Sequence, residues 1–389
     1  MQRSTQRILT THTGSIARPD DLIETMREKE NGRPYDAAAF ELRVASAVSE
    51  CVSRQLETGL DVINDGEQRK SGFTNYLAER IGGFESEPVA SDPLRESPWR
   101  EVGEFPEYYA RYFKDAMWGA MLSPPRRLVC RGPVSYIGRE ALAADIANLG
   151  SALGGRSYVE AFMSSVMPTA LAGYENEHYD SREEFLGALA DAVREEYTAI
   201  VDAGFVIQLD DPGAAQLWGH GELEPSLRRK AVDETVELIN WSLRGIPEEK
   251  VRYHTCYSIN QGPHVHDLHL HDYIEPMLRI NAQAISFEVM NPRHLHDHHT
   301  FEEVRLPEGK IIIPGMLSHG ANWVEHPELI AELTVRYAKL VGRENVMIGN
   351  DCGFASQAAS REVDPKVGWA KFAALVEGAR LASEQLWRD

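Results

Sequence analysis

The sequence alternates between short β-rich runs and helical patterns along its whole length, and this alternation constrains the fold more than any other feature. Each run is rich in β-branched or other apolar residues and closes on glycine or a polar residue, as strands do. The eight runs cover residues 8–13, 60–65, 128–134, 205–210, 251–256, 284–288, 310–316 and 346–351. Strands that alternate with helices form a parallel sheet, so eight units predict an α/β protein with a single (β/α)8 TIM barrel rather than a doubly wound sheet.

Start and stop signals support the helices between these runs. Ser181 and Glu184 form a capping box that predicts a helix start, and Gly204 predicts the end of that helix just before the next run. Pro365 opens a pattern that predicts a closing helix over residues 365–386. Both helices therefore fit the alternation of strand and helix.

Two stretches are longer than a normal connection between elements. They lie near residues 85–125 and 137–180, and we expect them to be insertions over the barrel mouth. No stretch has the composition of a linker, so we expect residues 1–389 to form one domain.

The composition excludes several classes of protein. A hydrophobic content of 43% argues against disorder, and a formal net charge of −20 repels nucleic-acid phosphates and anionic membrane surfaces. The four scattered cysteines are too few for the disulfide framework of a secreted domain, and no apolar run approaches the roughly 20 residues of a membrane span. We therefore expect a mature, soluble, cytoplasmic protein with small-molecule partners, and the composition leaves a homo-oligomer open.

Candidate metal ligands follow several of the predicted strands, at the end where barrel enzymes carry their catalytic groups. His254 and Cys256 lie two residues apart, so both side chains face the same side of a strand. Glu288 and Cys352 end two further strands and reach the same rim. One imidazole, two thiolates and one carboxylate suit Zn²⁺; the alternative is a core histidine beside an inert cysteine.

Histidine is concentrated in the second half of the chain, with eleven of the fourteen histidines between His254 and His326. Histidine pairs around residues 264–271 and 294–299 suggest a second metal site. A polar, solvated loop explains the same residues, because His-x-His spacing in a loop has no fixed geometry, and we favour that interpretation. His319 follows the seventh run, where it is either a proton-transfer catalyst or a surface-loop histidine.

The polar strand ends resemble, in order, the motifs of the catalytic barrel of cobalamin-independent methionine synthase. The matching segments are Thr13-Gly14-Ser15 with Arg18-Pro19, Asp65-Gly66-Glu67, Gln208-Leu209-Asp210-Asp211-Pro212, His254-Thr255-Cys256, Glu288 and Asp351-Cys352-Gly353. The resemblance spans nearly the whole chain and implies a zinc-dependent methyltransferase with a (β/α)8 fold.

The resemblance also implies roles for individual residues. Its zinc ligands are carried over to His254, Cys256, Glu288 and Cys352. The family's substrate site implies that Gly14 and Ser15 hold the carboxylate of an amino acid, while Glu67 and Asp210 hold its ammonium group. The rival interpretation of the two carboxylates is structural, such as capping the helices that follow.

The chain departs from the full-length family in two ways. It has room for one barrel only, and no tryptophan follows the Gly132-Pro133-Val134 segment, where the family stacks one on the pterin. Folate is therefore a doubtful donor, and the single-barrel relatives that the chain is similar to include core methionine synthases, which use a methyl-corrinoid. We predict methyl transfer to homocysteine or a related thiol. The alternatives are epoxyalkane:coenzyme M transferase-like thiol alkylation, a zinc-free uroporphyrinogen decarboxylase-like enzyme and a non-catalytic binding barrel.

Overall fold

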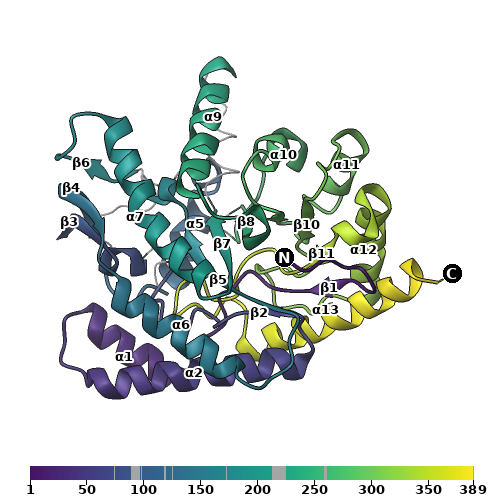
Figure 1. Ribbon diagram of the computed structural model, residues 1–389, viewed down its shortest axis with the longest axis horizontal. Helices are drawn as coiled ribbons and strands as arrows, with labels where there is room; N and C mark the ends of the chain where they lie inside the picture. Colours follow the sequence, from purple (N-terminus) through teal and green to yellow (C-terminus); the bar gives the residue numbers. More distant parts are fainter. Residues whose placement is uncertain are drawn as a thin grey trace.

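A parallel sheet surrounded by helices forms the centre of the computed structural model (Figure 1). The structure describes residues 1–73, 75–88, 97, 99–117, 120–124, 126–171, 173–212, 225–257 and 261–388. Across its main sheet the strands follow the order β10 (Ile311–Pro314), β9 (Ala284–Phe287), β8 (Val251–Thr255), β7 (Val206–Asp211), β5 (Glu160–Val166) and β2 (Val62–Ile63). Every pairing in it is parallel, which confirms the predicted α/β class.

A second parallel pair joins the two ends of the chain. Strand β1 (Leu9–Thr10) pairs with β11 (Met347–Ile348). Parallel bridges link Ile312 to Val346 and Gly315 to Gly349, so β10 continues toward β11. On the other side, the Asp61 amide donates to the Thr10 carbonyl at 3.2 Å, which places β2 beside β1.

Helices cover the outside of these strands. They are α1 (Asp20–Glu30), α2 (Ala37–Thr58), α4 (Glu101–Glu104), α5 (Pro106–Tyr112), α6 (Arg139–Leu153), α7 (Arg182–Asp202), α9 (Pro225–Ser242), α10 (Leu270–Leu278), α11 (Thr300–Glu303), α12 (Pro327–Val341) and α13 (Pro365–Leu386). The Ser181 hydroxyl accepts a hydrogen bond from the Glu184 amide at 3.1 Å, and Asp364 caps α13. The two helices predicted from capping signals are therefore confirmed.

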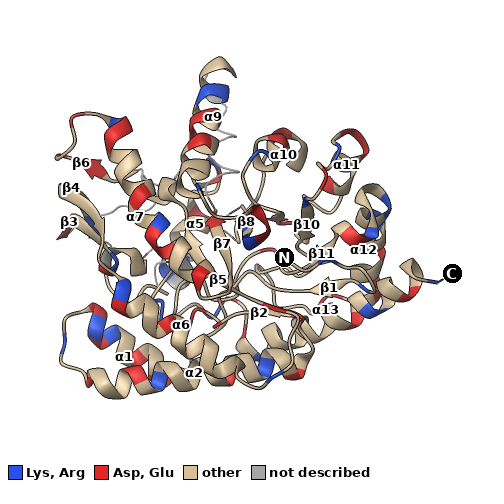
Figure 2. Cartoon of the chain, in the orientation of Figure 1, with Lys and Arg blue, Asp and Glu red and all other residues tan. Residues whose placement is uncertain are grey.

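Short helical turns complete the chain. They are η1 (Asn75–Glu79), η2 (Phe113–Met117), η3 (Pro168–Ala170), η4 (Glu248–Lys250), η5 (Asp297–His299) and η6 (Arg343–Asn345). No helix within the described ranges is long and apolar enough to cross a membrane. Figure 2 shows acidic and basic residues interspersed along the helices.

The third predicted strand does not belong to the main sheet. Residues 128–134 lie in β4 (Arg126–Tyr136), which pairs antiparallel with β3 (Ile81–Pro88) and parallel with β6 (Glu175–Asn176) in a separate sheet. The strand beside β2 is β5, inside the stretch that the sequence suggests is an insertion. The prediction of an insertion at 137–180 is therefore wrong, because α6 and β5 supply a helix and a strand of the main fold.

Burial explains this error. Strand β4 has exposed residues interspersed with buried ones, whereas β5 is buried along nearly its whole length. A strand buried on both faces usually reads as a continuous apolar run, but Ser164 and Ser165 interrupt β5. Both hydroxyls have partners in the interior: the Ser164 hydroxyl accepts from the Gln208 side chain at 3.4 Å, and the Ser165 hydroxyl lies 3.2 Å from the Tyr76 hydroxyl.

The stretch 85–125 lies partly outside the described residues. Its described part contains α4, α5 and an aromatic cluster around Tyr109 and Phe113. It contacts the loop that follows β8, where the Tyr108 hydroxyl donates to the Gln261 carbonyl at 3.3 Å. This segment therefore lies against a loop at the carboxyl ends of the strands, as an insertion on that side should.

Apolar side chains fill the space between the strands. One inner cluster draws residues from strands at both ends of the main sheet and from the β1–β11 pair. Its members are Leu9, Val62, Phe162, Val206, Ala284, Ile311, Ile313 and Met347. The buried Arg252 guanidinium lies over the Phe162 ring at 4.1 Å, so a charged group from β8 also reaches this interior.

Candidate functional site

A small cavity at the carboxyl ends of the strands gathers most of the candidate residues. It is lined by Thr13, Ser15, Glu67, Phe73, Asp210, Pro212, His254, Cys256, Cys352, Gly353 and Ser356. These residues come from segments that are hundreds of positions apart in sequence, and parallel strands bring them together because their carboxyl ends share one edge. The structure thus unites three predicted ligands with three of the four predicted substrate residues, Ser15, Glu67 and Asp210.

Two thiols and one imidazole form the floor of this cavity. The sulfur atoms of Cys256 and Cys352 are 3.3 Å apart without a disulfide, and all three ligand atoms lie within 4.8 Å of one another. His254 is 3% exposed, Cys256 is 1% exposed and Cys352 is 8% exposed. Three potential metal ligands are therefore shielded from bulk water.

The His254 ring is prepared for a ligand on one side. Its Nδ1 lies 3.2 Å from the Ser286 hydroxyl, whereas its buried Nε2 has no hydrogen-bond partner among the described residues. Burial, helped by the nearby positive charge of Arg252, lowers the pKa of His254 to about 3. The imidazole is therefore neutral at physiological pH, the state in which it binds a metal.

Glu288 lies in a neighbouring cluster rather than with these three residues. Its carboxylate is grouped with His319 and Asp351, whose ligand atoms lie within 4.8 Å of one another, and all three side chains are buried. Its Oε2 atom accepts from the amide of Tyr257, the residue after Cys256, at 3.0 Å. This hydrogen bond holds the carboxylate beside the thiol cluster. Glu288 could bind a metal in that cluster only if its hydrogen bond to the Tyr257 amide broke.

The surface-loop interpretation of His319 is wrong. The residue is 6% exposed and lies beside Glu288 and Asp351. Its carbonyl accepts from the Gln261 side chain at 3.4 Å, which ties it to the loop after β8. A buried imidazole beside two carboxylates is able to hold or transfer a proton.

Glu67, which is buried, and Asp210, which is half-buried, place two carboxylates on the wall of the cavity. Glu67 has a left-handed backbone (φ 55°), an uncommon conformation for a residue with a side chain, and such strain clusters at functional sites. Asp210 accepts from the Gln208 side chain at 2.7 Å. Burial, then the charge of Glu67, raises the pKa of Asp210 well above its ordinary value. The pair therefore favours a cation in this part of the cavity.

Lys70 partly balances these carboxylates and was missed in the sequence analysis. Its ammonium group is buried, 3.9 Å from Glu67 Oε2, and donates to the Ser164 carbonyl at 2.6 Å. Arg252, also missed, donates to the Thr11 hydroxyl and the His12 carbonyl at 2.9 Å. A charged residue within an apolar strand was the available signal for Arg252, because a buried charge requires partners.

Two glycines allow the loops around the cavity to approach each other. A Cβ atom on Gly14 (φ 130°) would lie 2.6 Å from both Glu67 Oε1 and Ser164 Oγ. A Cβ atom on Gly353 would lie 1.9 Å from the Ser15 hydroxyl. The backbone of Gly14 and the hydroxyl of Ser15 therefore lie directly against the other walls of the site.

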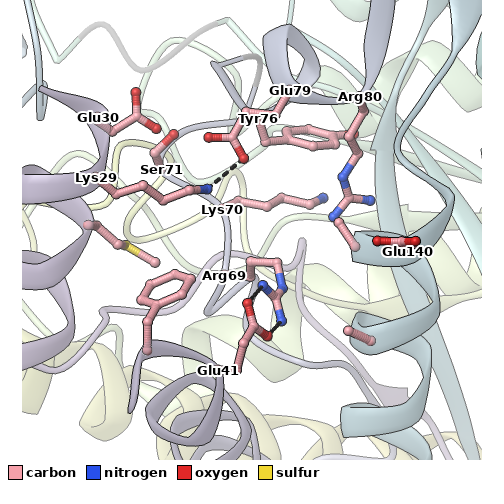
Figure 3. A pocket seen from close by; sticks show the side chains of 14 residues that line it. Lys29, Glu30, Glu41, Arg69, Lys70, Ser71, Tyr76, Glu79, Arg80 and Glu140 are labelled. Atoms are coloured by element: carbon pink, nitrogen blue, oxygen red, sulfur yellow. Dashed lines mark hydrogen bonds and ion pairs between the residues drawn. The ribbon is translucent and has the colours of Figure 1, made fainter. Parts of the chain in front are cut away.

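A larger cavity of about 360 Å³ lies between α1, α2, η1 and α6 (Figure 3). Lys70 lines this cavity too, and two ion pairs join other lining residues to each other. Lys29 contacts Glu79 at 2.6 Å, and Arg69 contacts Glu41 at 2.7 Å. The smaller cavity is the better candidate for the functional site, because it gathers the two thiols, the imidazole and the carboxylates of Glu67 and Asp210.

The fold and this cavity define an α/β protein with a pocket of two thiols, one imidazole and two carboxylates at the carboxyl ends of parallel strands. The chain belongs to the cobalamin-independent synthase family. The family described as "Cobalamin-independent synthase, Catalytic domain" matches residues 167–375, more than half of the chain. The match includes His254, Cys256 and Cys352, so the thiol cluster lies in the region that defines the family.

Two curated relatives are similar over almost the whole chain. The methionine synthase of Sulfurisphaera tokodaii is 24% identical over 383 residues, which cover 97% of this chain and 93% of that protein. The methionine synthase of Saccharolobus solfataricus is 24% identical over 387 residues, covering 97% and 96%.

Solved structures share the fold. A B12-independent methionine synthase from Shewanella sp. W3-18-1, in complex with selenomethionine, has a TM-score of 0.69 at 18% identity and covers 98% of this chain and 99% of that one. A putative vitamin-B12-independent methionine synthase from Listeria monocytogenes has a TM-score of 0.66 at 19% identity and covers 98% and 100%.

Proposed function

We propose that this protein is a zinc-dependent methyltransferase that forms a carbon–sulfur bond on a small thiol, with homocysteine as the preferred acceptor. The observation that carries the proposal is the buried group of His254, Cys256 and Cys352, with sulfur atoms 3.3 Å apart. The names of the curated relatives, which are methionine synthases, support the same activity.

The donor set fits zinc. Zn²⁺ binds two thiolates and a neutral imidazole at about 2.3 Å to sulfur and 2.0 to 2.1 Å to nitrogen. The His254 Nε2 atom has no hydrogen-bond partner among the described residues, so its lone pair would be available to such an ion. Zinc held here would lower the pKa of an incoming thiol and so supply a thiolate at neutral pH. Glu288 is the proposed fourth ligand before the thiol binds, after release of its bond to the Tyr257 amide.

The residues around the metal site would bind an amino acid. Glu67 and Asp210 would receive the ammonium group, because a buried ammonium is costly unless it is paired. The Gly14 backbone and the Ser15 hydroxyl would hold the carboxylate. A sulfonate thiol has no ammonium group, so the same two carboxylates would repel it, and this difference places coenzyme M second to homocysteine.

The transfer itself requires alignment more than additional chemistry. The methyl carbon forms a bond to the acceptor sulfur as its bond to the donor breaks, so the two partners must lie in line. His319, beside Glu288 and Asp351, would accept the proton released by the thiol or return one to the leaving group. We propose a methyl-corrinoid as the donor, since the segment after Pro133 has no tryptophan on which a pterin could stack.

We also propose that the chain is one closed (β/α)8 barrel over residues 1–389 and that it works in the cytoplasm. Closure is supported by the bridges between β10 and the β11 segment, by the Asp61–Thr10 hydrogen bond and by the inner apolar cluster that spans the strands. The cytoplasmic location is supported by the scattered cysteines, which suit a reducing compartment. An experimental structure with a gap between β1 and β2 would contradict closure.

The test supplies homocysteine and coenzyme M separately to the zinc-loaded enzyme, with methyl-corrinoid, methyl-folate and epoxide donors. We expect turnover with homocysteine, and we expect Glu67→Gln and Asp210→Asn each to raise its KM about 10- to 100-fold, because each replaces a carboxylate acceptor of the ammonium group with a neutral one. Glu79→Gln, a change in the larger cavity, is the matched control and should leave KM unchanged.

The remaining outcomes separate the alternatives. Turnover of coenzyme M alone, unaffected by either variant, would favour thiol alkylation of the epoxyalkane type. Purified active protein without stoichiometric zinc would favour a decarboxylase-like enzyme. No turnover with any donor and acceptor would contradict the proposed function.

A further inference from the structure

Two histidine-bearing segments that are separate in the sequence meet in the folded chain. His269 directly precedes α10, and His296 directly precedes η5, whose first residue is Asp297. The Nδ1 atom of His269 lies 3.6 Å from Asp297 Oδ1, and the Nε2 atom of His296 lies 3.8 Å from the same oxygen. All three ligand atoms lie within 4.8 Å of one another, so one carboxylate oxygen faces two imidazoles.

Asp297 is held in place by bonds to its other oxygen. Its side chain is 3% exposed, and Oδ2 lies 2.9 Å from His294 Nδ1 and accepts from the Leu270 amide at 3.3 Å. His294 in turn contacts Asp267 at 3.0 Å. The carboxylate is therefore oriented by a histidine and by the first turn of α10, with Oδ1 left toward His269 and His296.

An oriented ligand with a hydrogen-bonded partner behind it is the usual arrangement of a metal site. Here His294 stands behind Asp297 in that way, and Asp267 stands behind His294.

We propose that His269, His296 and Asp297 form a second metal site, which binds a divalent transition-metal cation of the zinc class. Ligands at 2.0 to 2.1 Å around a tetrahedral ion are about 3.4 Å apart, so distances of 3.6 and 3.8 Å need only small shifts. Those shifts fall on the two histidines, whose side chains are 53% and 56% exposed, while Asp297 stays fixed. His269 must also release the Asp272 amide, which its side chain caps at the start of α10. Two imidazoles exclude Mg²⁺ and Ca²⁺ as preferred ions, and water would fill the open positions.

The site would connect two segments near the thiol pocket. A metal there links the start of α10 to the segment that carries His294. The His294 ring stacks on Tyr257 with centroids 4.0 Å apart, and the Tyr257 amide donates to Glu288. The bound cation would therefore stabilise the loop that positions the Tyr257 amide. This structural role is independent of the proposed methyl transfer.

The experiment uses full-length protein without a histidine tag, saturated with zinc and freed of excess metal, to which Co²⁺ is added. We expect one further equivalent of Co²⁺, with d–d absorption and without a thiolate-to-cobalt charge-transfer band, because its ligands are imidazole and carboxylate. Added Zn²⁺ should raise the Tm, since a cation that binds only the folded state stabilises it. His269→Ala and His296→Ala should each lower the affinity for this further equivalent of Co²⁺ by at least about tenfold. Each should also abolish the increase in Tm on addition of Zn²⁺.

The matched control is His299→Ala, which removes an exposed histidine of the same segment that contacts Glu302 and is not part of the cluster. It should bind the further equivalent as tightly as the unchanged protein. Absence of that equivalent in the unchanged protein, a thiolate band in its spectrum, or an equal loss in His299→Ala would each overturn the proposal. Because no readout is enzymatic turnover, this result is separate from the test of the proposed function.

Discussion

The two histidine clusters of this protein differ in how the chain presents its ligands. His254, Cys256 and Cys352 come from strand ends and are buried, whereas His269 and His296 come from loops and are more than half exposed. Buried polar atoms cost free energy when they lack partners, and exposed ones are satisfied by water. The thiol cluster therefore depends on a bound ligand to satisfy its buried polar atoms. Water satisfies the polar atoms of the surface cluster, so that cluster should bind metal more weakly.

The largest expected effect comes from breaking the thiol cluster. Cys352→Ser replaces a soft ligand with a hydroxyl, so we expect loss of the tightly bound zinc and a fall in turnover of more than about 100-fold. The apolar core between the strands does not include this side chain, so the far-ultraviolet circular dichroism should be unchanged. Metal content by mass spectrometry and steady-state turnover measure the two effects.

Cys130→Ser is the control, since Cys130 is buried on β4 outside the cavity. It should keep its zinc. If Cys352→Ser also keeps zinc and turnover, the thiol cluster is not the metal site, and the contrast between the two clusters disappears.

A smaller effect should follow from crowding the rigid wall of the buried site. Gly14→Ala places a methyl group 2.6 Å from Glu67 Oε1 and Ser164 Oγ at a backbone φ of 130°. We expect a loss of about 1 to 3 kcal/mol in unfolding free energy together with weaker acceptor binding, because Glu67 must move. Chemical denaturation and the KM for the acceptor measure these effects.

Gly32→Ala provides the matched comparison. Gly32 also has a positive φ, 64°, but a Cβ atom there would meet nothing within 4 Å. It should show only the cost of the backbone conformation, with an unchanged KM. Equal effects of the two substitutions on KM would contradict the close packing of the wall.

The smallest effect concerns Glu362, which contacts Tyr112 of the aromatic segment and accepts from the Gln261 side chain at 2.8 Å. Burial raises the pKa of Glu362 to about 7, although a hydrogen bond with Tyr112 opposes the shift. A raised pKa means that the folded state binds the proton more tightly, so this stabilisation is complete below pH 4.5 and is lost as the pH rises to about 7. Glu362→Gln should remove this pH-dependent difference in stability.

The measurement is the unfolding free energy of both proteins between pH 4 and pH 8. The variant should equal the unchanged protein at the acid end and exceed it in stability at the alkaline end. A constant difference in unfolding free energy across the whole range would show that Glu362 is not buried by the aromatic segment around Tyr112. The surroundings of Glu362 would then resemble the open surface of the second cluster.

Most strands and several site residues could be predicted from the sequence. Seven of the eight predicted runs contain strands of the parallel sheets, because an apolar run closed by a polar residue is a local signal. The same local signal marked His254, Cys256 and Cys352 at strand ends. The exception was the third strand, because Ser164 and Ser165 in β5 resemble a loop in sequence and their hydroxyls find partners only in the folded interior.

The α/β class, the strand ends and the kinds of side chain at those ends could thus be predicted from the sequence. These features depend on periodicity and spacing along the chain. Tertiary structure alone decided which carboxylate contacts which group. It placed Glu288 with His319 and Asp351, put Lys70 beside Glu67, and joined His269 to Asp297. The physical reason is that local patterns specify the face on which a side chain lies, whereas contacts between distant segments depend on how the elements pack.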